Sequence, residues 1–290
     1  MIFRKKHLNF LIICILAIPA LIEAASLSRR SFSQDLAAAQ AAQDADQQQA
    51  SFCLVIDPGH GGKDSGVLFG ATLAEKTLTL NLARKLQELI DSDPELNIKV
   101  LLTRVEDQDL PLDSRAAIAN HHRADLFLSI HFGSYLYPAV ESMQIFIADY
   151  SSEELEYLSM INESWSLMQS KHLAESREFG RYIEQAVRAS GAFAAVNFLK
   201  APIYFLKGAS MAAVEVEAGF APSEENIKKL ESEDYQWQLA KILLQGIVSF
   251  LNKEQEQSQL SSSSELSPPA EIDRARENLY GQGTRQEQEQ

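Results

Sequence analysis

The sequence is poor in cysteine and in positive charge. Its 290 residues include 2 cysteines, too few for a disulfide framework or for a zinc site built from thiolates. Lysine and arginine total 26 against 40 aspartate and glutamate residues, which gives a formal net charge of −14 at pH 7. Because nucleic acid and anionic lipid surfaces are bound by clustered positive charge, we expect no nucleic-acid partner and no lasting membrane attachment. Hydrophobic residues make up 46% of the chain, enough for a sizeable core.

The N-terminal residues have the pattern of a secretory signal peptide. Arg4, Lys5 and Lys6 precede an apolar run from Leu8 to Leu21, and Ala24 and Ala25 offer small residues for cleavage. The run is shorter than the ~20 residues of a membrane-spanning helix, which favours cleavage over an uncleaved anchor. We therefore expect residues 1–25 to be removed on export.

The rest of the chain divides by composition into a linker, one domain and a tail. Residues 26–50 are rich in Ala, Gln and Ser, which predicts a linker. Residues 252–290 are rich in Gln, Glu and Ser and lack apolar periodicity, which predicts a disordered tail. The folded unit is expected to be a single domain over residues 51–251.

Strand patterns alternate with helical patterns inside this domain. The expected strands are 52–57, 98–103, 125–130, 143–148 and 213–217, and the expected helices are 78–90, 112–120, a long stretch over roughly 152–190, and 232–251. This order predicts an α/β fold in which a mostly parallel sheet is sandwiched by helices.

Four polar residues lie where such a sheet would place a site. His60 follows the first strand in VIDPGHGGKDSG, Glu75 precedes a Leu-rich helix, His131 ends the strand DLFLSIH, and Glu217 ends the strand AAVEVE. Open α/β sheets bind ligands at the carboxyl ends of their strands, so these side chains are expected to converge. Two imidazoles and a carboxylate suit catalytic zinc, and a second carboxylate can take a proton from water. Each residue alone is more often a capping or core residue, and only their convergence favours a site.

At these residues the chain resembles the zinc-dependent N-acetylmuramoyl-L-alanine amidases, cell-wall enzymes of the type with a VIDPGHGG opening. LLTRVEDQDLPLDSRAAIAN followed by RADLFLSIH is similar to the family's second block, and KAPIYFLKGASMAAVEVEAGF resembles the block that ends in Glu-x-Gly-Phe. The resemblance covers residues 52–250. It implies that His60, Glu75 and His131 bind Zn²⁺ and that Glu217, two residues before Gly219, is the catalytic base.

The resemblance implies a peptidoglycan hydrolase of the periplasm, expected to be a monomer. It would cleave the amide bond between N-acetylmuramic acid and the L-alanine of the stem peptide, in cell-wall remodelling and cell division. Strand alternation puts Glu215 on the same face as Glu217, so periodicity alone does not choose between the two carboxylates. Phe132-Gly133 stands where the family usually has Ala-Asn, and Ala221-Pro222-Ser223 where it usually has Ser-Asn, which bears on substrate fit.

Three other functions are alternatives to the amidase. A zinc peptidase acting on stem peptides would share the fold and the metal ligands, and differs in its products. A non-catalytic cell-wall binding protein would keep the fold without needing all four polar residues. A penicillin-binding acyl-serine enzyme requires Ser-x-x-Lys, and no lysine after residue 25 has a serine three residues before it.

Residues 149–170 form a segment that the shortest family members do not need. Apolar residues at helical spacing predict a helix that docks on another surface. Two interpretations stay open: a helix packed on the sheet, or a plug whose carboxylate fills the open metal position until an activator protein displaces it. The carboxylates concerned are Glu153, Glu154, Glu156 and Glu163.

Overall fold

The computed structural model describes residues 52–134, 141–160 and 164–265. The expected signal peptide, the expected linker and residues 266–290 of the expected tail lie outside these residues. Within the described ranges, no helix combines the length and the apolar character that crossing a membrane requires.

Six strands form the central sheet. In the order in which they hydrogen-bond, they are β4 (Ile98–Leu102), β1 (Phe52–Pro58), β5 (Leu126–Ser134), β8 (Ala212–Phe220), β6 (Ser142–Ala148) and β7 (Ala195–Ala201). The first four run parallel to one another; β6 is antiparallel to β8, and β7 is parallel to β6. The predicted mostly parallel sheet is confirmed, and the carboxyl ends of β1, β5 and β8 meet at one edge.

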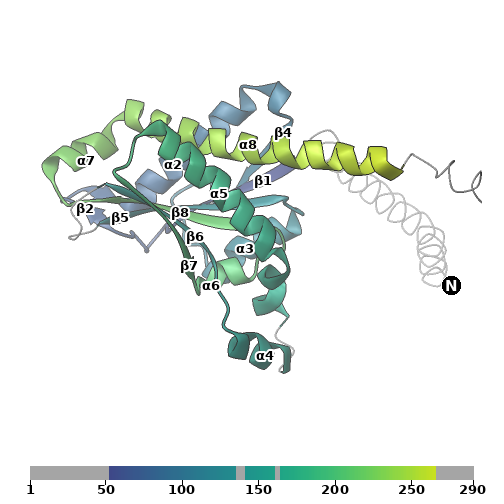
Figure 1. Cartoon of the computed structure of the whole chain (residues 1–290). Helices are drawn as coiled ribbons and strands as arrows, with labels where there is room; N and C mark the ends of the chain where they lie inside the picture. The colour runs from purple at the N-terminus through teal and green to yellow at the C-terminus, as the bar shows by residue number, and fades with distance from the viewer. Residues whose placement is uncertain (1–51, 135–140, 161–163, 266–290) are drawn as a thin grey trace, which may run out of the picture.

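Helices cover both faces of this sheet (Figure 1). One face packs against α2 (Glu75–Asp91), α5 (Leu173–Ser190) and α8 (Glu233–Glu265), and it holds the larger hydrophobic core. In α2, Leu78, Leu82 and Leu86 recur at helical spacing and are buried against the strands. The opposite face, which we call the site face, packs against α3 (Leu112–His121), η2 (Trp165–His172) and α6 (Tyr204–Lys207).

Shorter elements complete the chain. The hairpin of β2 (Leu68–Phe69) and β3 (Leu73–Ala74) leads into α2, and η1 (Pro94–Leu96) joins α2 to β4. α4 (Ser152–Met160) follows β6 and lies at the periphery of the domain, while α7 (Glu224–Glu231) precedes α8 (Figure 1).

Three differences from the sequence expectations concern the strands of the main sheet and the longer helices. The helix expected over 152–190 is interrupted, because α4 ends at Met160 and α5 begins only at Leu173. Strand β7 lies outside the expected strands, because Asn197 and Lys200 interrupt its apolar residues and three of its seven residues are exposed. α8 continues past residue 251 to Glu265, because Glu, Gln and Lys favour helix and the first Pro comes at Pro268.

Candidate metal centre

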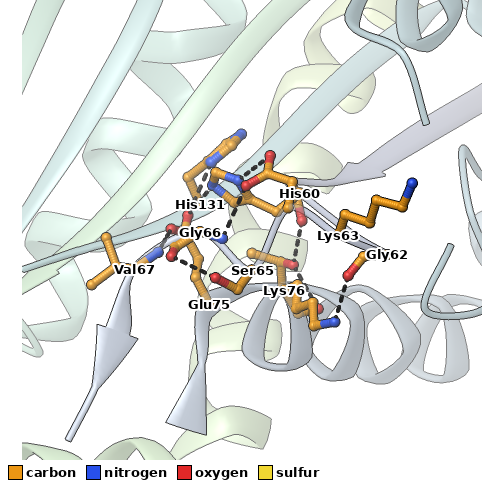
Figure 2. Close-up of polar contacts among 12 residues, drawn as sticks. His60, Gly62, Lys63, Ser65, Gly66, Val67, Glu75, Lys76 and His131 are labelled. Atoms are coloured by element: carbon orange, nitrogen blue, oxygen red, sulfur yellow. Dashed lines mark hydrogen bonds and ion pairs between the residues drawn. The ribbon is translucent and has the colours of Figure 1, made fainter. Parts of the chain in front are cut away.

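Two histidines and a glutamate meet at the carboxyl edge of the site face. His60 follows β1, Glu75 is the first residue of α2, and His131 lies in β5. One ligand atom from each residue lies within 4.8 Å of the others, and Figure 2 shows the three side chains pointing toward one another. Among the described residues, this is the one group of three or more His, Cys, Asp or Glu side chains with such an arrangement. The convergence expected for these three residues is present.

Glu75 lies at the centre of this group. Its Oε1 atom is 3.0 Å from His60 Nε2 and 3.0 Å from His131 Nδ1, and it accepts a hydrogen bond from the Phe132 amide. Its Oε2 atom accepts one from the Val67 amide. Burial would raise the pKa of this carboxyl, but hydrogen bonds from His131 and His60 lower the pKa to about 2. Glu75 is therefore an ionised carboxylate held at both oxygens.

The loop that carries His60 needs two glycines at points of close approach. A Cβ atom at Gly59 would lie 2.3 Å from the His131 ring, and one at Gly66 would lie 2.5 Å from Glu75 Oε2. His60 has a φ of 60°, a left-handed conformation that is uncommon for a residue with a side chain. Its Nδ1 atom lies 2.8 Å from Asp64 Oδ2, which turns Nε2 toward Glu75.

Two buried arginines hold the backbone of this loop, and sequence reasoning did not assign them to the site. Arg104 donates hydrogen bonds to the carbonyls of Pro58 and Gly59. Arg115 donates to the carbonyls of Pro58 and His60. Three successive carbonyls are thereby fixed, which stabilises the uncommon conformation of His60. The available signal was position, because Arg104 closely follows β4 and Arg115 is the fourth residue of α3.

Asp57 balances the charge of Arg115 beneath the metal ligands. Its side chain is fully buried and lies 2.8 Å from Arg115 Nη1. It also accepts hydrogen bonds from the hydroxyls of Thr103 and Ser129, at 2.5 and 2.9 Å. A buried carboxylate is tolerated when it is paired and hydrogen-bonded in this way. Asp57 therefore ties α3 to the strands that carry the ligands.

The register of the sheet places Glu217 directly beside His131. β5 and β8 pair these two residues, whereas Glu215 pairs with Ser129, two residues deeper. Glu217 is partly exposed, but Glu215 is 8% exposed. Burial raises the pKa of Glu215 to about 6, although His131 acts in the opposite direction. Both carboxylates belong to the site face, as alternation predicted, and the structure separates them by depth.

The three ligands fit a zinc ion. Two imidazoles and one carboxylate are a donor set typical of catalytic zinc, which keeps a further position for water or substrate. Burial would lower the pKa of His131, but its hydrogen bond to Glu75 raises the pKa to about 9. The site therefore attracts positive charge even without an ion. A metal must displace that proton, so its affinity is expected to fall as the pH is lowered.

α4 packs against η2 and is joined to α6 by an ion pair, away from the candidate metal ligands. Glu154 forms an ion pair with Lys207, whose ammonium lies over the Tyr150 ring. Leu158 is buried. Among the described residues, no carboxylate of α4 joins the ligand group, and Glu163 lies outside the described residues. For residues 152–160 the structure agrees with a helix packed on the domain.

Comparison with known proteins matches most of the described domain to one family. Residues 54–249 match the sequence profile of a family described as N-acetylmuramoyl-L-alanine amidase. N-acetylmuramoyl-L-alanine amidase AmiC of Escherichia coli O6:H1 is 28% identical over 219 residues, which cover 68% of this chain and 52% of AmiC. The chain thus spans about half the length of that relative.

Solved structures share the fold. The CwlD amidase of Clostridioides difficile, determined in complex with the GerS lipoprotein, is 24% identical with a TM-score of 0.57, covering 70% of this chain and 99% of that chain. N-acetylmuramoyl-L-alanine amidase AmiC2 of Nostoc punctiforme is 25% identical with a TM-score of 0.53, covering 69% of this chain and 97% of that chain.

Proposed function

This chain belongs to the N-acetylmuramoyl-L-alanine amidase family, and we propose that it is a zinc-dependent peptidoglycan hydrolase. The bond cleaved is the amide between the lactyl group of N-acetylmuramic acid and the L-alanine of the stem peptide. One observation carries the proposal: His60, Glu75 and His131 converge beside Glu217 within the part of the chain that matches the family.

His60, Glu75 and His131 are the residues that would hold zinc. When bound there, zinc supplies Lewis-acid chemistry that activates water and polarises the scissile carbonyl. The chain itself arranges its ligands in advance. Asp64 orients the His60 ring, and the amides of Val67 and Phe132 fix the Glu75 carboxylate. Such supporting contacts typically contribute 10–100-fold to metal affinity or activity.

We assign the role of general base to Glu217. It lies beside His131 and is partly exposed, so water and substrate can reach it. Glu217 accepts the proton of the attacking water and passes it to the nitrogen of the leaving L-alanine. Glu215 suits this role less well, because it lies one step deeper beside the buried Ser129.

Digestion of purified peptidoglycan tests the reaction and its alternatives. An amidase releases whole stem peptides with a free L-alanine amino group and leaves glycan strands without peptides. A zinc peptidase instead releases single amino acids or shortened stems, and a non-catalytic binding protein releases nothing. Product masses are therefore measured together with the zinc content of the same protein. Single amino acids as the sole products would overturn the amidase assignment.

Export to the periplasm follows from the same proposal, because the substrate lies outside the cytoplasm. Its support is the N-terminal pattern of residues 1–25, which lie outside the described residues. N-terminal sequencing of the exported protein checks it. The expected first residue follows Ala24 or Ala25, and a retained N-terminus would indicate an anchor.

Control by an activator protein acting on residues 149–170 stays a prediction. Its support is that Tyr157 and Met160 of α4 are 61% and 77% exposed, and that CwlD was determined with a lipoprotein partner. Glu163→Gln tests the plug interpretation, with Glu153→Gln on α4 as the matched control. A several-fold rise in hydrolysis for Glu163→Gln alone supports a plug, and equal rates leave the segment a packed helix.

A further inference from the structure

Two rows of paired side chains cross the site face toward its β7 edge. We call the first the upper row, because it lies at the carboxyl edge of β5 and β8; it consists of His131, Glu217, Gln144 and Asn197. The lower row lies two residues deeper and consists of Asp57, Ser129, Glu215, Phe146 and Leu199. Residues paired across neighbouring strands point to the same side of a sheet. The upper row therefore continues from the metal ligand and the proposed base through two carboxamide side chains.

The β6–β7 end of these rows is accessible. Asn197 is exposed and Leu199 is 40% exposed, while Gln144 and Phe146 are half-buried. Asp57 and Ser129, at the other end of the lower row, are fully buried. Apolar and amide side chains are thus presented to solvent next to the proposed base.

The other side of the same two strands is packed. Ile145 and Val196 alternate with the accessible residues and belong to the larger hydrophobic core. Phe179 and Ile183 of α5 lie in that core as well. Gln144, Phe146, Asn197 and Leu199 are therefore more exposed to solvent than the residues that alternate with them on the core side.

Two glycines lie at the edge of the upper row. Gly133 of β5 pairs with Gly219 of β8, two residues beyond His131 and Glu217 toward the end of each strand. Glycine in a strand interior often marks a place where a ligand or another backbone approaches closely. Both glycines are buried, so the accessible part of the upper row is its Gln144 and Asn197 end.

The dimensions of the upper row match a short peptide. Neighbouring strands lie ~4.8 Å apart, so Asn197 is two strands, or ~10 Å, from Glu217. An extended peptide advances ~3.3–3.6 Å per residue, so three residues span this distance. A carboxamide offers both a donor and an acceptor, as a peptide group does. Phe146 and Leu199 lie beside the amides and can contact apolar side chains of the peptide.

We propose that Gln144 and Asn197 are specificity-determining residues that hydrogen-bond the stem peptide as it crosses β6 and β7 from the cleaved bond. The inference rests on the proposed amidase activity. Gln144 lies one strand from Glu217 and meets the peptide near its second residue. Asn197 lies two strands away and meets the third. The enzyme therefore selects stems of at least three residues.

Disaccharide substrates that carry stems of one to four residues test this assignment. For Asn197→Ala, kcat/KM is expected to fall ~3–10-fold with stems of three or four residues and to stay unchanged with one or two. For Gln144→Ala, the loss is expected to begin with stems of two residues. Both losses should appear in KM and not in kcat, because the contacts bind ground state and transition state alike. Lys200→Ala, at an exposed residue on the opposite face of β7, and Gln238→Ala, at an exposed residue of α8, are the matched controls.

A binding measurement separates this inference from the proposed function. Calorimetric titration of the Glu217→Gln protein with the same substrates should show the same dependence on stem length, lost again when Asn197→Ala is added. If the parent hydrolyses the substrates but the effects of Asn197→Ala and Gln144→Ala do not depend on stem length, or depend on the number of sugars, the peptide-contact inference is wrong and the amidase activity stands. If the zinc-loaded parent binds the substrates in a way that depends on stem length but cleaves none of them, the amidase activity is wrong and the peptide contact stands.

Discussion

The upper and lower rows of the site face use the same strands but differ in accessibility and in their partners. In the lower row, Asp57 and Ser129 are fully buried and hydrogen-bonded to each other. In the upper row, the His131 side chain is 18% exposed and Asn197 is exposed. Along β5 and β8, two residues thus separate a buried polar layer from one that water and substrate can reach. The depth of a polar residue along its strand decides whether it supports the site or can react.

The two carboxylates of the lower row lie in different electrostatic environments. Asp57 has Arg115, Thr103 and Ser129 as partners, so its charge is compensated. Glu215 is buried with a raised pKa, so its charged form is disfavoured. We therefore expect changes in the upper row to affect zinc and turnover, and changes in the lower row to affect stability.

The largest effect is expected for the metal ligands. His60→Ala or His131→Ala leaves two protein ligands, which is too few to hold zinc well, so both the ion and hydrolysis should be lost. Elemental analysis of the purified variants should give one zinc per chain for the parent and none for either variant. Parent activity should disappear with a chelator and return with added zinc. Undiminished hydrolysis by a protein shown to be free of metal would reject the site.

Glu217→Gln is expected to have the next largest effect. The amide keeps the shape of the side chain but cannot accept the water proton, so kcat should fall by ~10²–10⁴. Zinc content and thermal unfolding should match the parent. A near-normal rate in the zinc-loaded variant would move the base to another residue, and Glu215→Gln is the comparison that identifies it.

The sequence predicted the alternation of strands and helices because apolar periodicity is a local property. It also predicted that His60, Glu75 and His131 converge, since each lies near the end of a recognisable strand or at the start of a helix. The sequence did not indicate how deeply each carboxylate lies, because strand alternation puts Glu215 and Glu217 on one face and only the pairing with β5 separates them. No local pattern indicates the hydrogen bonds that fix the His60 loop. Arg104 and Arg115 donate them to backbone carbonyls 45 and 55 residues away in the sequence.

Arg115→Met tests the supporting role of the lower row. The substitution leaves the Asp57 carboxylate buried without its cation, which should lower the free energy of unfolding by ~3–5 kcal/mol. Urea unfolding in the presence of a chelator measures this without a contribution from zinc. The double variant Asp57→Asn, Arg115→Met removes the unpaired charge and should recover part of the loss. A single variant as stable as the parent would show that the pair is dispensable and that the two rows differ less than the structure indicates.

Glu215→Gln is expected to have the smallest effect and to depend on pH. In the folded protein the pKa of Glu215 is about 6, against an ordinary value of 4.5, so the folded state holds more protons than the unfolded state between these values. The parent should therefore lose stability as the pH rises from 4.5 through 6, by about 2 kcal/mol in all. Glutamine does not titrate, so in chelator the variant should gain about that much relative to the parent between pH 4.5 and pH 7.5. Because Glu215 lies deeper than Glu217, the proposed general base, turnover by the zinc-loaded variant should stay within a few-fold of the parent. A pH-independent difference in stability, combined with a loss of turnover as large as that of Glu217→Gln, would place Glu215 among the reacting groups and erase the distinction between the rows.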